Sequence, residues 1–322
     1  MFSKSNNSNA TPILVTAAWQ LVKNIATVAL FQHLTKPALP MFLRGCDIIS
    51  SAPLTLGTHE PQLVSLLNNY ANQGYIDFLI DIGANIGLTS CQSGLLFKKV
   101  VMFEPNPLCI GVLQSNTSLM LDQVPHEIHN FGLGIRDETL TLRIPKHNWG
   151  GAYVVTRENT YSANTLMQKD GFTHDDPANY LTRDIKIRNA ADALAKVFDE
   201  LTLSGAARGI IKIDVEGLES VVLNAIAESV PASLELVVVF EHWGSTFEPT
   251  ALLESFGGRA QLFSLIKSPS GGSSVLGKLL RILRQGDQRF ELSPWSSGDQ
   301  ANDFVLEVAS EHNTKRQCLR PG

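Results

Sequence analysis

Residues 78–87 read FLIDIGANIG, a short apolar run that ends in an acid and is followed by two glycines four positions apart. This pattern is typical of a buried strand that breaks into a tight turn and continues as a helix. Glycines in such a turn let a ligand lie against bare backbone. Another apolar run, residues 98–105 (KKVVMFEP), carries a second acid, Glu104. Together these elements predict a pocket for an adenosine-containing ligand.

The spacing of the glycines separates two kinds of adenosine-containing cofactor. The order is Asp81-x-Gly83-x-Asn85-x-Gly87, which departs from the G-x-G-x-x-G fingerprint of dinucleotide sites. An acid before the turn would repel a pyrophosphate but suits a cation. S-adenosylmethionine carries an ammonium and a sulfonium and no phosphate, so it is the expected cofactor. Glu104 would accept hydrogen bonds from its ribose hydroxyls. The alternative is that the glycines only build a tight turn.

Length and composition fit one large core, or one core with a small appendage. The chain has 322 residues, 44% of them hydrophobic and 18% charged. A net charge of −5 provides no basic surface, so nucleic acid is not an expected partner. The cysteines are scattered and form no C-x-x-C pair, which predicts neither a disulfide framework nor structural zinc and favours the reducing cytoplasm.

Residues 1–56 are expected to form an N-terminal helical extension. Its apolar stretch, residues 11–31, is interrupted by Gln20, Lys23 and Asn24, which argues against a transmembrane segment. The stretch also lacks the uninterrupted apolar core of a signal peptide. We expect an amphipathic helix that packs on the domain or on a partner, with contact to a membrane surface as the alternative.

From residue 57 to about 310, apolar strand-like runs alternate with helical patterns. This alternation predicts an α/β fold with a doubly wound, parallel, Rossmann-like sheet. Residues 148–190 have few apolar runs and are expected to form an irregular insert, and residues 311–322 a solvated tail. Residues 139–145 are expected to add a hairpin strand. The seven main strands are expected at residues 78–82, 100–103, 126–134, 209–214, 235–242, 261–267 and 303–309.

Ligands of such sheets bind beyond the carboxyl ends of the strands, where polar residues gather. The expected rim consists of Asp81, Glu104, Asn130, Asp214, Glu216, Glu241 and His242. We expect Asn130 to join the cofactor-binding residues. Lys212 and Asp214 are two apart on one strand and point to the same face. They form either a structural ion pair or, with Glu216, a group that faces the reacting centre and holds acceptor or metal.

Five segments carry a resemblance to a known family: FLIDIGANIG, FEPNP, FGLGIRDETLTLRIP, the NWGGA turn and above all IIKIDVEG. They resemble the FkbM family of S-adenosylmethionine-dependent methyltransferases over about residues 57–310. The resemblance implies a seven-stranded sheet whose last strand is antiparallel, and O-methylation of sugars or of polyketide- and polysaccharide-type products. It also implies that Asp81, Gly83, Asn85 and Gly87 contact the methionine moiety and that Glu104 contacts the ribose. The FEHW segment, residues 240–243, departs from the family pattern.

A hydroxyl acceptor needs a base to remove its proton. His242 is the candidate because imidazole titrates near neutrality, and the alternative is a histidine that satisfies a loop. Asp214, Glu216 and Glu241 could hold Mg²⁺, but their spacing follows no metal motif, so no metal site is assigned. The turn around Trp149, Gly150 and Gly151 is either a platform or lid over the ligands or a buried anchor.

Three functions are compatible with these patterns. The leading hypothesis is O-methylation of a hydroxyl on a saccharide or related biosynthetic metabolite. The alternative is a catalytically inactive, methyltransferase-like binding protein in a biosynthetic complex. A nucleotide-dependent oxidoreductase is disfavoured because the dinucleotide fingerprint is absent. Assembly into a homo-oligomer is left open.

Overall fold

Two β-sheets organise the computed structural model, which describes residues 19–30, 39–157, 159, 176–242, 248–268, 289–296 and 302–311. The large sheet has eight strands in the order β11-β10-β12-β9-β8-β1-β2-β3. The strands of this sheet are β1 (Phe78–Ile82), β2 (Val100–Phe103), β3 (His126–His129), β8 (Arg208–Ile213), β9 (Glu235–Glu241), β10 (Ala260–Ser268), β11 (Arg289–Pro294) and β12 (Asp303–Val308).

The order of these strands confirms the predicted fold class. Strands β3, β2, β1, β8 and β9 are parallel, and β12 runs antiparallel to its neighbours β9 and β10. The last strand is therefore antiparallel, as expected. The strand count differs from the expected seven, because β11 pairs with β10 at one edge.

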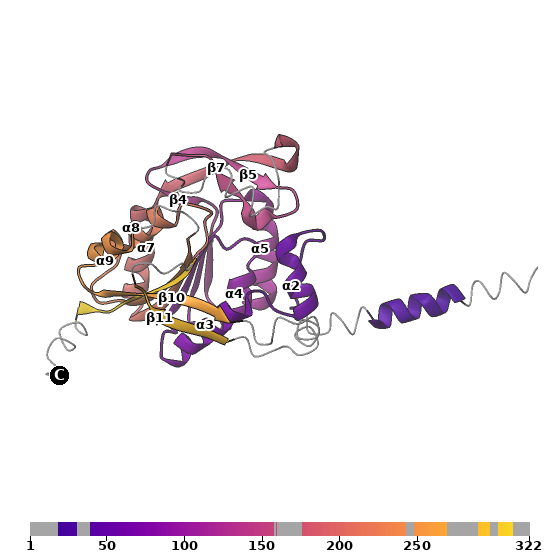
Figure 1. Ribbon diagram of the computed structural model, residues 1–322, viewed down its shortest axis with the longest axis horizontal. Coiled ribbons are helices and arrows are strands. Elements are labelled where there is room, and N and C mark those ends of the chain that lie inside the picture. Colours follow the sequence, from indigo (N-terminus) through magenta and orange to yellow (C-terminus); the bar gives the residue numbers. More distant parts are fainter. Residues whose placement is uncertain are drawn as a thin grey trace, which may run out of the picture.

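Helices cover both faces of the large sheet (Figure 1). One face packs under α7 (Ala190–Leu203), α8 (Glu219–Ser229) and α9 (Pro249–Ser255), the other under α3 (Pro61–Asn72), α4 (Leu88–Ser93) and α5 (Pro107–Met120). Alternate residues of one strand enter opposite cores: Ile80 packs under α7 and α8, and Leu79 packs under α3. Because both faces are covered, the central strands read as continuous apolar runs.

A smaller sheet stands above the carboxyl ends of the central strands, in the order β4-β7-β5-β6 (Figure 1). Its strands are β4 (Gly132–Gly134), β5 (Glu138–Pro145), β6 (Tyr153–Val154) and β7 (Tyr180–Asn189). Two expectations are corrected here. The single strand expected at 126–134 divides into β3 and β4 in different sheets. Residues 180–189, expected within an irregular insert, are a regular strand whose exposed polar residues hide its apolar alternation.

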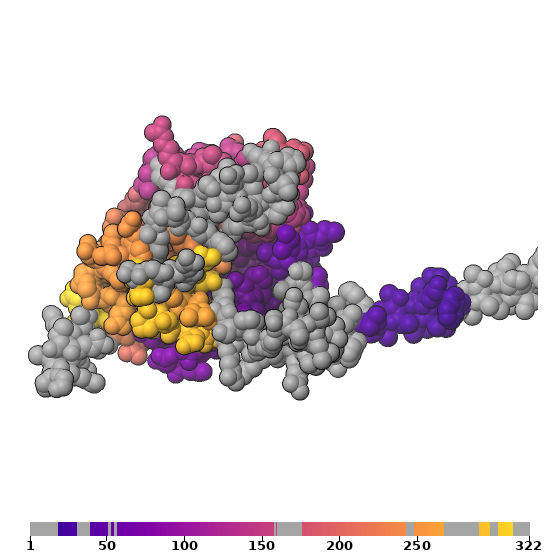
Figure 2. Space-filling model, in the orientation of Figure 1, coloured from indigo at the N-terminus to yellow at the C-terminus, as the bar shows by residue number. Residues whose placement is uncertain are grey.

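Residues 39–57, here called the N-terminal strap, run along the flank of the domain and contain α2 (Ile48–Leu56). Met41, Leu43 and Ile49 pack against Ile86 and Cys109, on the glycine loop and α5. Figure 2 shows the indigo surface of the N-terminal segment adjoining the magenta surface that belongs to the second sheet. The strap therefore lies against the rim at which ligands of this fold bind.

Residues 19–30 form a separate helix whose side chains are exposed. Its polar residues Gln20, Lys23, Asn24 and Thr27 fall on one side at helical spacing, as expected for an amphipathic helix. None of the helices within the described ranges combines the length and apolarity needed to cross a membrane. The other parts of the expected helix, residues 11–18 and 31, and the tail from residue 312 lie outside the described residues.

Candidate functional site

The glycine loop between β1 and α4 is held in a conformation that only particular residues adopt. Gly83, Asn85 and Gly87 all have positive φ, at 80°, 52° and 88°. A Cβ on Gly83 would lie 1.9 Å from the backbone O of Asp214, so no side chain fits there. The amides of Gly83 and Ala84 both donate to the O of Phe103. The turn predicted from the glycine spacing is therefore present and is locked between β2 and β8.

Glu104 follows β2 and faces this loop with a buried carboxylate. Its Oε2 accepts from the amide of Asn85 and its Oε1 from the amide of Asn106, each over 2.7 Å. Burial raises the pKa of Glu104 to about 7, against the two hydrogen bonds, which favour the charged form. Each oxygen keeps acceptor capacity for a further donor, as a ribose-binding acid requires.

Asp81 is buried beneath the loop and paired within the protein. Its Oδ2 accepts from Ser90 Oγ over 2.7 Å, and its Oδ1 lies 3.2 Å from Lys212 Nζ. The same Lys212 nitrogen donates to the O of Gly83 over 2.9 Å and lies 3.5 Å from Asp214 Oδ2. Although burial works against its charge, the carboxylates of Asp81 and Asp214 raise the pKa of Lys212 above its ordinary value. The cluster fixes the loop from below.

Two cavities flank the glycine loop and share Gly83, Asn85, Gly150 and Asp214 in their walls. The first lies between the loop and the second sheet, and Glu104 is part of its lining. Its apolar lining includes Phe131, Leu133, Leu142, Ile187, Val215 and Leu218. The buried Nε1 of Trp149, a residue that lines this cavity, finds no acceptor among the described residues. An apolar slot with a carboxylate at one end fits a nucleoside.

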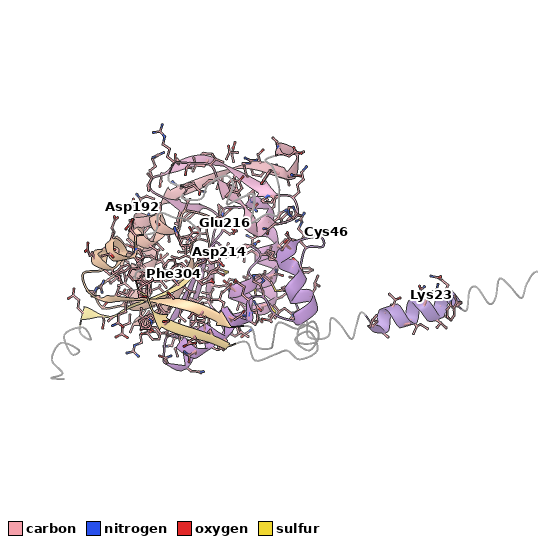
Figure 3. All side chains as sticks on the ribbon, in the orientation of Figure 1. Lys23, Cys46, Asp192, Asp214, Glu216 and Phe304 are labelled. Carbon is pink, nitrogen blue, oxygen red and sulfur yellow. The ribbon has the colours of Figure 1, made fainter. Side chains whose placement is uncertain are left out.

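The second cavity is strongly acidic. It lies between the N-terminal strap and the ends of β8, β9 and β12. The carboxylates in its lining are Glu60, Asp214, Glu216, Glu241 and Asp303, against which stand Lys212, already ion-paired, and His59. Figure 3 shows Asp214 and Glu216 side by side near the centre of the molecule, below the second sheet. This lining favours cations and hydroxyl donors and disfavours anions.

Some of the predicted site residues line the cavities and others do not. Gly83, Asn85, Glu104 and Asp214 meet at the two cavities, and Glu216 lines the second. Gly87 caps the start of α4 and, like Asp81, lines neither cavity.

Two further candidates do not themselves line either cavity. Asn130 is exposed, and its neighbours Phe131 and Gly132 line the first cavity in its place. His242 is 4% exposed and lines neither cavity, which does not favour its predicted role as the base.

Sequence reasoning missed several residues of the site. Ile49, His59 and Glu60 line the second cavity from the N-terminal side, where the sequence carries no motif. Lys212 was expected as half of an ion pair and not as the donor that holds Gly83. The turn around Trp149, Gly150 and Gly151, expected from the sequence to be a platform or lid or a buried anchor, contributes to the walls of both cavities.

Within the described ranges, no group of three or more histidine, cysteine, aspartate or glutamate side chains is arranged to hold a metal ion. The acids Asp214, Glu216 and Glu241 share one cavity without forming such a group.

Comparison with known proteins gives one informative similarity. Over 191 residues, the chain is 30% identical to the methyltransferase sdnD of Sordaria araneosa, covering 56% of this chain and 73% of that protein. No protein-family model matches the chain.

Solved structures are similar only at a low level. The precorrin-6y C5,15-methyltransferase of Geobacter metallireducens has 10% identity and a TM-score of 0.37, covering 79% of this chain and 93% of that chain. A SAM-dependent methyltransferase of Agrobacterium tumefaciens has 12% identity and a TM-score of 0.37, covering 76% and 61%. TM-scores this low carry no weight for the function of the chain.

Proposed function

The chain belongs to the methyltransferase superfamily, and we propose that it uses S-adenosylmethionine to methylate a hydroxyl group of a neutral saccharide or related biosynthetic metabolite. Within the superfamily, the segments DIGANIG and IKIDVEG support an FkbM-type enzyme. The observation that carries the proposal is the junction of the two cavities at Asn85 and Asp214, with Glu104 at one side and the acidic lining at the other. Donor and acceptor would meet at this junction.

The residues present fit S-adenosylmethionine. Glu104 has free acceptor capacity for the ribose, and the apolar walls around Phe131 and Leu133 suit an adenine ring. The carboxylates of the second cavity suit the ammonium and the sulfonium. When bound, this cofactor supplies an already activated methyl group, so the contribution of the protein is mainly alignment of the acceptor.

Asp214 is the residue best placed to act on an acceptor hydroxyl. It lines both cavities, and its side chain is 45% exposed, so it can be reached from either. Its carboxylate can accept the hydroxyl proton or orient the oxygen through a hydrogen bond. Glu216 stands in the wall of the second cavity, held in a left-handed turn with a φ of 51°, and would contact the same acceptor.

The acidic lining also bears on the class of acceptor. A phosphorylated sugar or a nucleic acid would bring negative charge against five carboxylates, at a cost that burial increases. Hydroxyl groups, in contrast, donate hydrogen bonds to carboxylates. A neutral polyhydroxylated acceptor is therefore favoured over a polyanion.

Calorimetric titration tests the proposal first. We expect S-adenosylmethionine to bind and NADPH to show no binding, because the acidic cavity repels its phosphates. Glu104→Ala should weaken binding by roughly tenfold to a hundredfold, the value of a hydrogen bond to a charged group. Failure of the wild-type protein to bind S-adenosylmethionine would refute the proposal.

Transfer of a tritiated methyl group into fractions of a cell extract then tests activity. Incorporation into a neutral, periodate-sensitive fraction is expected. Binding of the cofactor without transfer to any fraction would instead favour the catalytically inactive, methyltransferase-like protein.

A further inference from the structure

The N-terminal strap is tied to the turn formed by residues 148–151, here called the Trp149 turn, across the rim of the site. Asp47 caps α2 through Oδ1, which accepts from the amide of Ile49 over 3.2 Å. Its Oδ2 accepts from the amide of Trp149, also over 3.2 Å. Beside it, the amide of Ile48 donates to the O of His147 over 3.1 Å. One carboxylate therefore joins two segments about a hundred residues apart in the sequence.

Arg44 adds further contacts between the N-terminal strap and the Trp149 turn. Its Nη1 donates to Asp47 Oδ2 over 2.7 Å, and its Nη2 donates to the O of Lys146. The guanidinium also stacks on the indole of Trp149, 4.2 Å from the ring centroid. Asp47 is almost fully buried, so this ion pair is well shielded from solvent on one side. The Arg44–Asp47 pair thus makes three contacts at or beside the Trp149 turn. Asp47 binds the amide of Trp149, and Arg44 binds the carbonyl of Lys146 and the face of the Trp149 ring.

A second anchor fixes the strap to the glycine loop. The buried side chain of Asn116, on α5, accepts from the amide of Phe42 over 2.6 Å and donates to the O of the same residue. Its Nδ2 also donates to the O of Ile86 over 2.8 Å. The base of the strap is therefore attached to the loop independently of Arg44. Loosening the Arg44–Asp47 pair should free the turn while the strap stays docked.

The turn held in this way is the wall between the two cavities. A Cβ on Gly150 would lie 2.9 Å from Asn85 Nδ2 and 3.2 Å from Ile49 Cγ2, so the turn is wedged between the glycine loop and the strap. Gly150 and Asn85 both line both cavities. Any displacement of the turn therefore changes both cavities at once.

We propose that Arg44 and Asp47 are positioning residues that hold the Trp149 turn closed over the bound donor and thereby set how long it stays bound. The inference rests on the proposed function, since it takes S-adenosylmethionine as the ligand. It extends the methyltransferase unit toward residue 39, because the strap then belongs to the site. A ligand enclosed by the turn leaves only when the turn moves, so the contacts of the pair enter the dissociation barrier.

The test is the dissociation rate of S-adenosylmethionine, measured by stopped-flow competition with excess S-adenosylhomocysteine. Arg44→Lys keeps the charge beside Asp47 but loses the planar stacking and the forked donor geometry. We expect it to raise the dissociation rate about tenfold, the equivalent of one lost charge-assisted hydrogen bond. Asp47→Ala should raise it further. Asp47→Asn has one acceptor oxygen in place of two and no charge for Arg44, so it should give a dissociation rate between those of the wild type and Asp47→Ala.

Arg136→Met is the matched control, because it removes an exposed arginine that pairs with Glu138 over 3.1 Å on the second sheet. It should leave the dissociation rate unchanged. Hydrogen exchange gives a second readout: in the complex, the Trp149 amide should exchange faster in Arg44→Lys than in the wild type. If Arg44→Lys and Asp47→Ala release the ligand at the wild-type rate and the exchange of the Trp149 amide is unchanged, the inference is overturned. If the wild type does not bind S-adenosylmethionine at all, the proposed function fails instead.

Discussion

Lys212 donates a hydrogen bond from Nζ to the backbone O of Gly83 over 2.9 Å and so joins the end of β8 to the glycine loop. The ammonium also lies 3.2 Å from Asp81 and 3.5 Å from Asp214. Asp81 is fully buried, and Lys212 is 7% exposed. The segments FLIDIGANIG and IIKIDVEG, which most strongly indicated function, are therefore joined through Lys212. Its role is to fix the loop against which the donor is proposed to bind.

Removal of Lys212 should therefore destabilise the protein strongly. Lys212→Met leaves the Asp81 carboxylate buried without its cation, a change that costs on the order of 3–5 kcal/mol. Replacing the acid as well, in Lys212→Met with Asp81→Asn, removes the unpaired charge and should recover part of that loss. Urea unfolding of the two single variants and the double variant measures this coupling. A double variant whose loss equals the sum of the single losses would contradict the pairing.

Gly83→Ala should be more damaging than an ordinary substitution of a positive-φ glycine. Gly205 provides the control, because it has a similar φ of 85° and nothing within 4 Å of its absent Cβ. Gly205→Ala should cost only the left-handed backbone strain, about 1–2 kcal/mol. Gly83→Ala adds the overlap with the O of Asp214 and should cost clearly more and weaken S-adenosylmethionine binding. If Gly83→Ala and Gly205→Ala lost the same stability in thermal and urea unfolding, the backbone at Asp214 would move aside at no cost and the prediction would be wrong.

The positions of Glu104 and the glycine loop could be predicted from sequence because they depend on local rules. A strand that ends in an acid, a glycine turn and a second strand with a terminal acid fix their own geometry within one βαβ unit. Glu104 lies beside the loop as expected. The same local rules do not determine the partners of Asp81. Its spacing placed it at the rim, but whether a strand-end acid faces a ligand or an internal lysine depends on β8, more than a hundred residues away.

The rest of the site depends on contacts that no local pattern encodes. The strap reaches the rim through Asn116 and Arg44, whose partners lie far along the chain. The sequence does not show strand β7 clearly because its polar face is exposed, while its apolar face, with Ile185 and Ile187, lines the first cavity. The role of His242 is likewise not fixed by its place after a strand. The side chain is buried and lines neither cavity, although its neighbour Glu241 lines the second.

The catalytic candidates should separate in steady-state kinetics once an acceptor is identified. Asp214→Asn should lower kcat by about 10²-fold or more, the usual contribution of a positioned proton acceptor. His242→Gln should leave kcat within a few-fold of the wild type, because His242 lines neither cavity. The affinity for S-adenosylmethionine, measured by calorimetry, serves as the control for intact donor binding. A large loss in His242→Gln together with a small one in Asp214→Asn would reverse this assignment.

The raised pKa of Glu104 predicts that donor binding depends on pH. In the free protein, burial raises this pKa from 4.5 to about 7, and the charges of Lys212 and Asp81 act on it in opposite directions. Ribose hydroxyls donate hydrogen bonds and so favour the carboxylate over the acid. Binding below pH 7 must therefore expel a proton. The affinity for S-adenosylmethionine should rise with pH up to about 7, approaching tenfold per unit at the lower end, and then level off.

The same shift has a consequence of opposite sign for the free protein. Because the folded state holds the Glu104 proton more tightly than the unfolded state, its contribution to stability is full below about pH 4.5 and is lost as pH rises to about 7. Glu104→Gln has no titrating proton at this position. In thermal unfolding it should lack this part of the pH dependence, and in calorimetry it should bind the donor weakly with no proton release near pH 6. A Glu104→Gln protein that retained the wild-type proton release would assign the titration to another group.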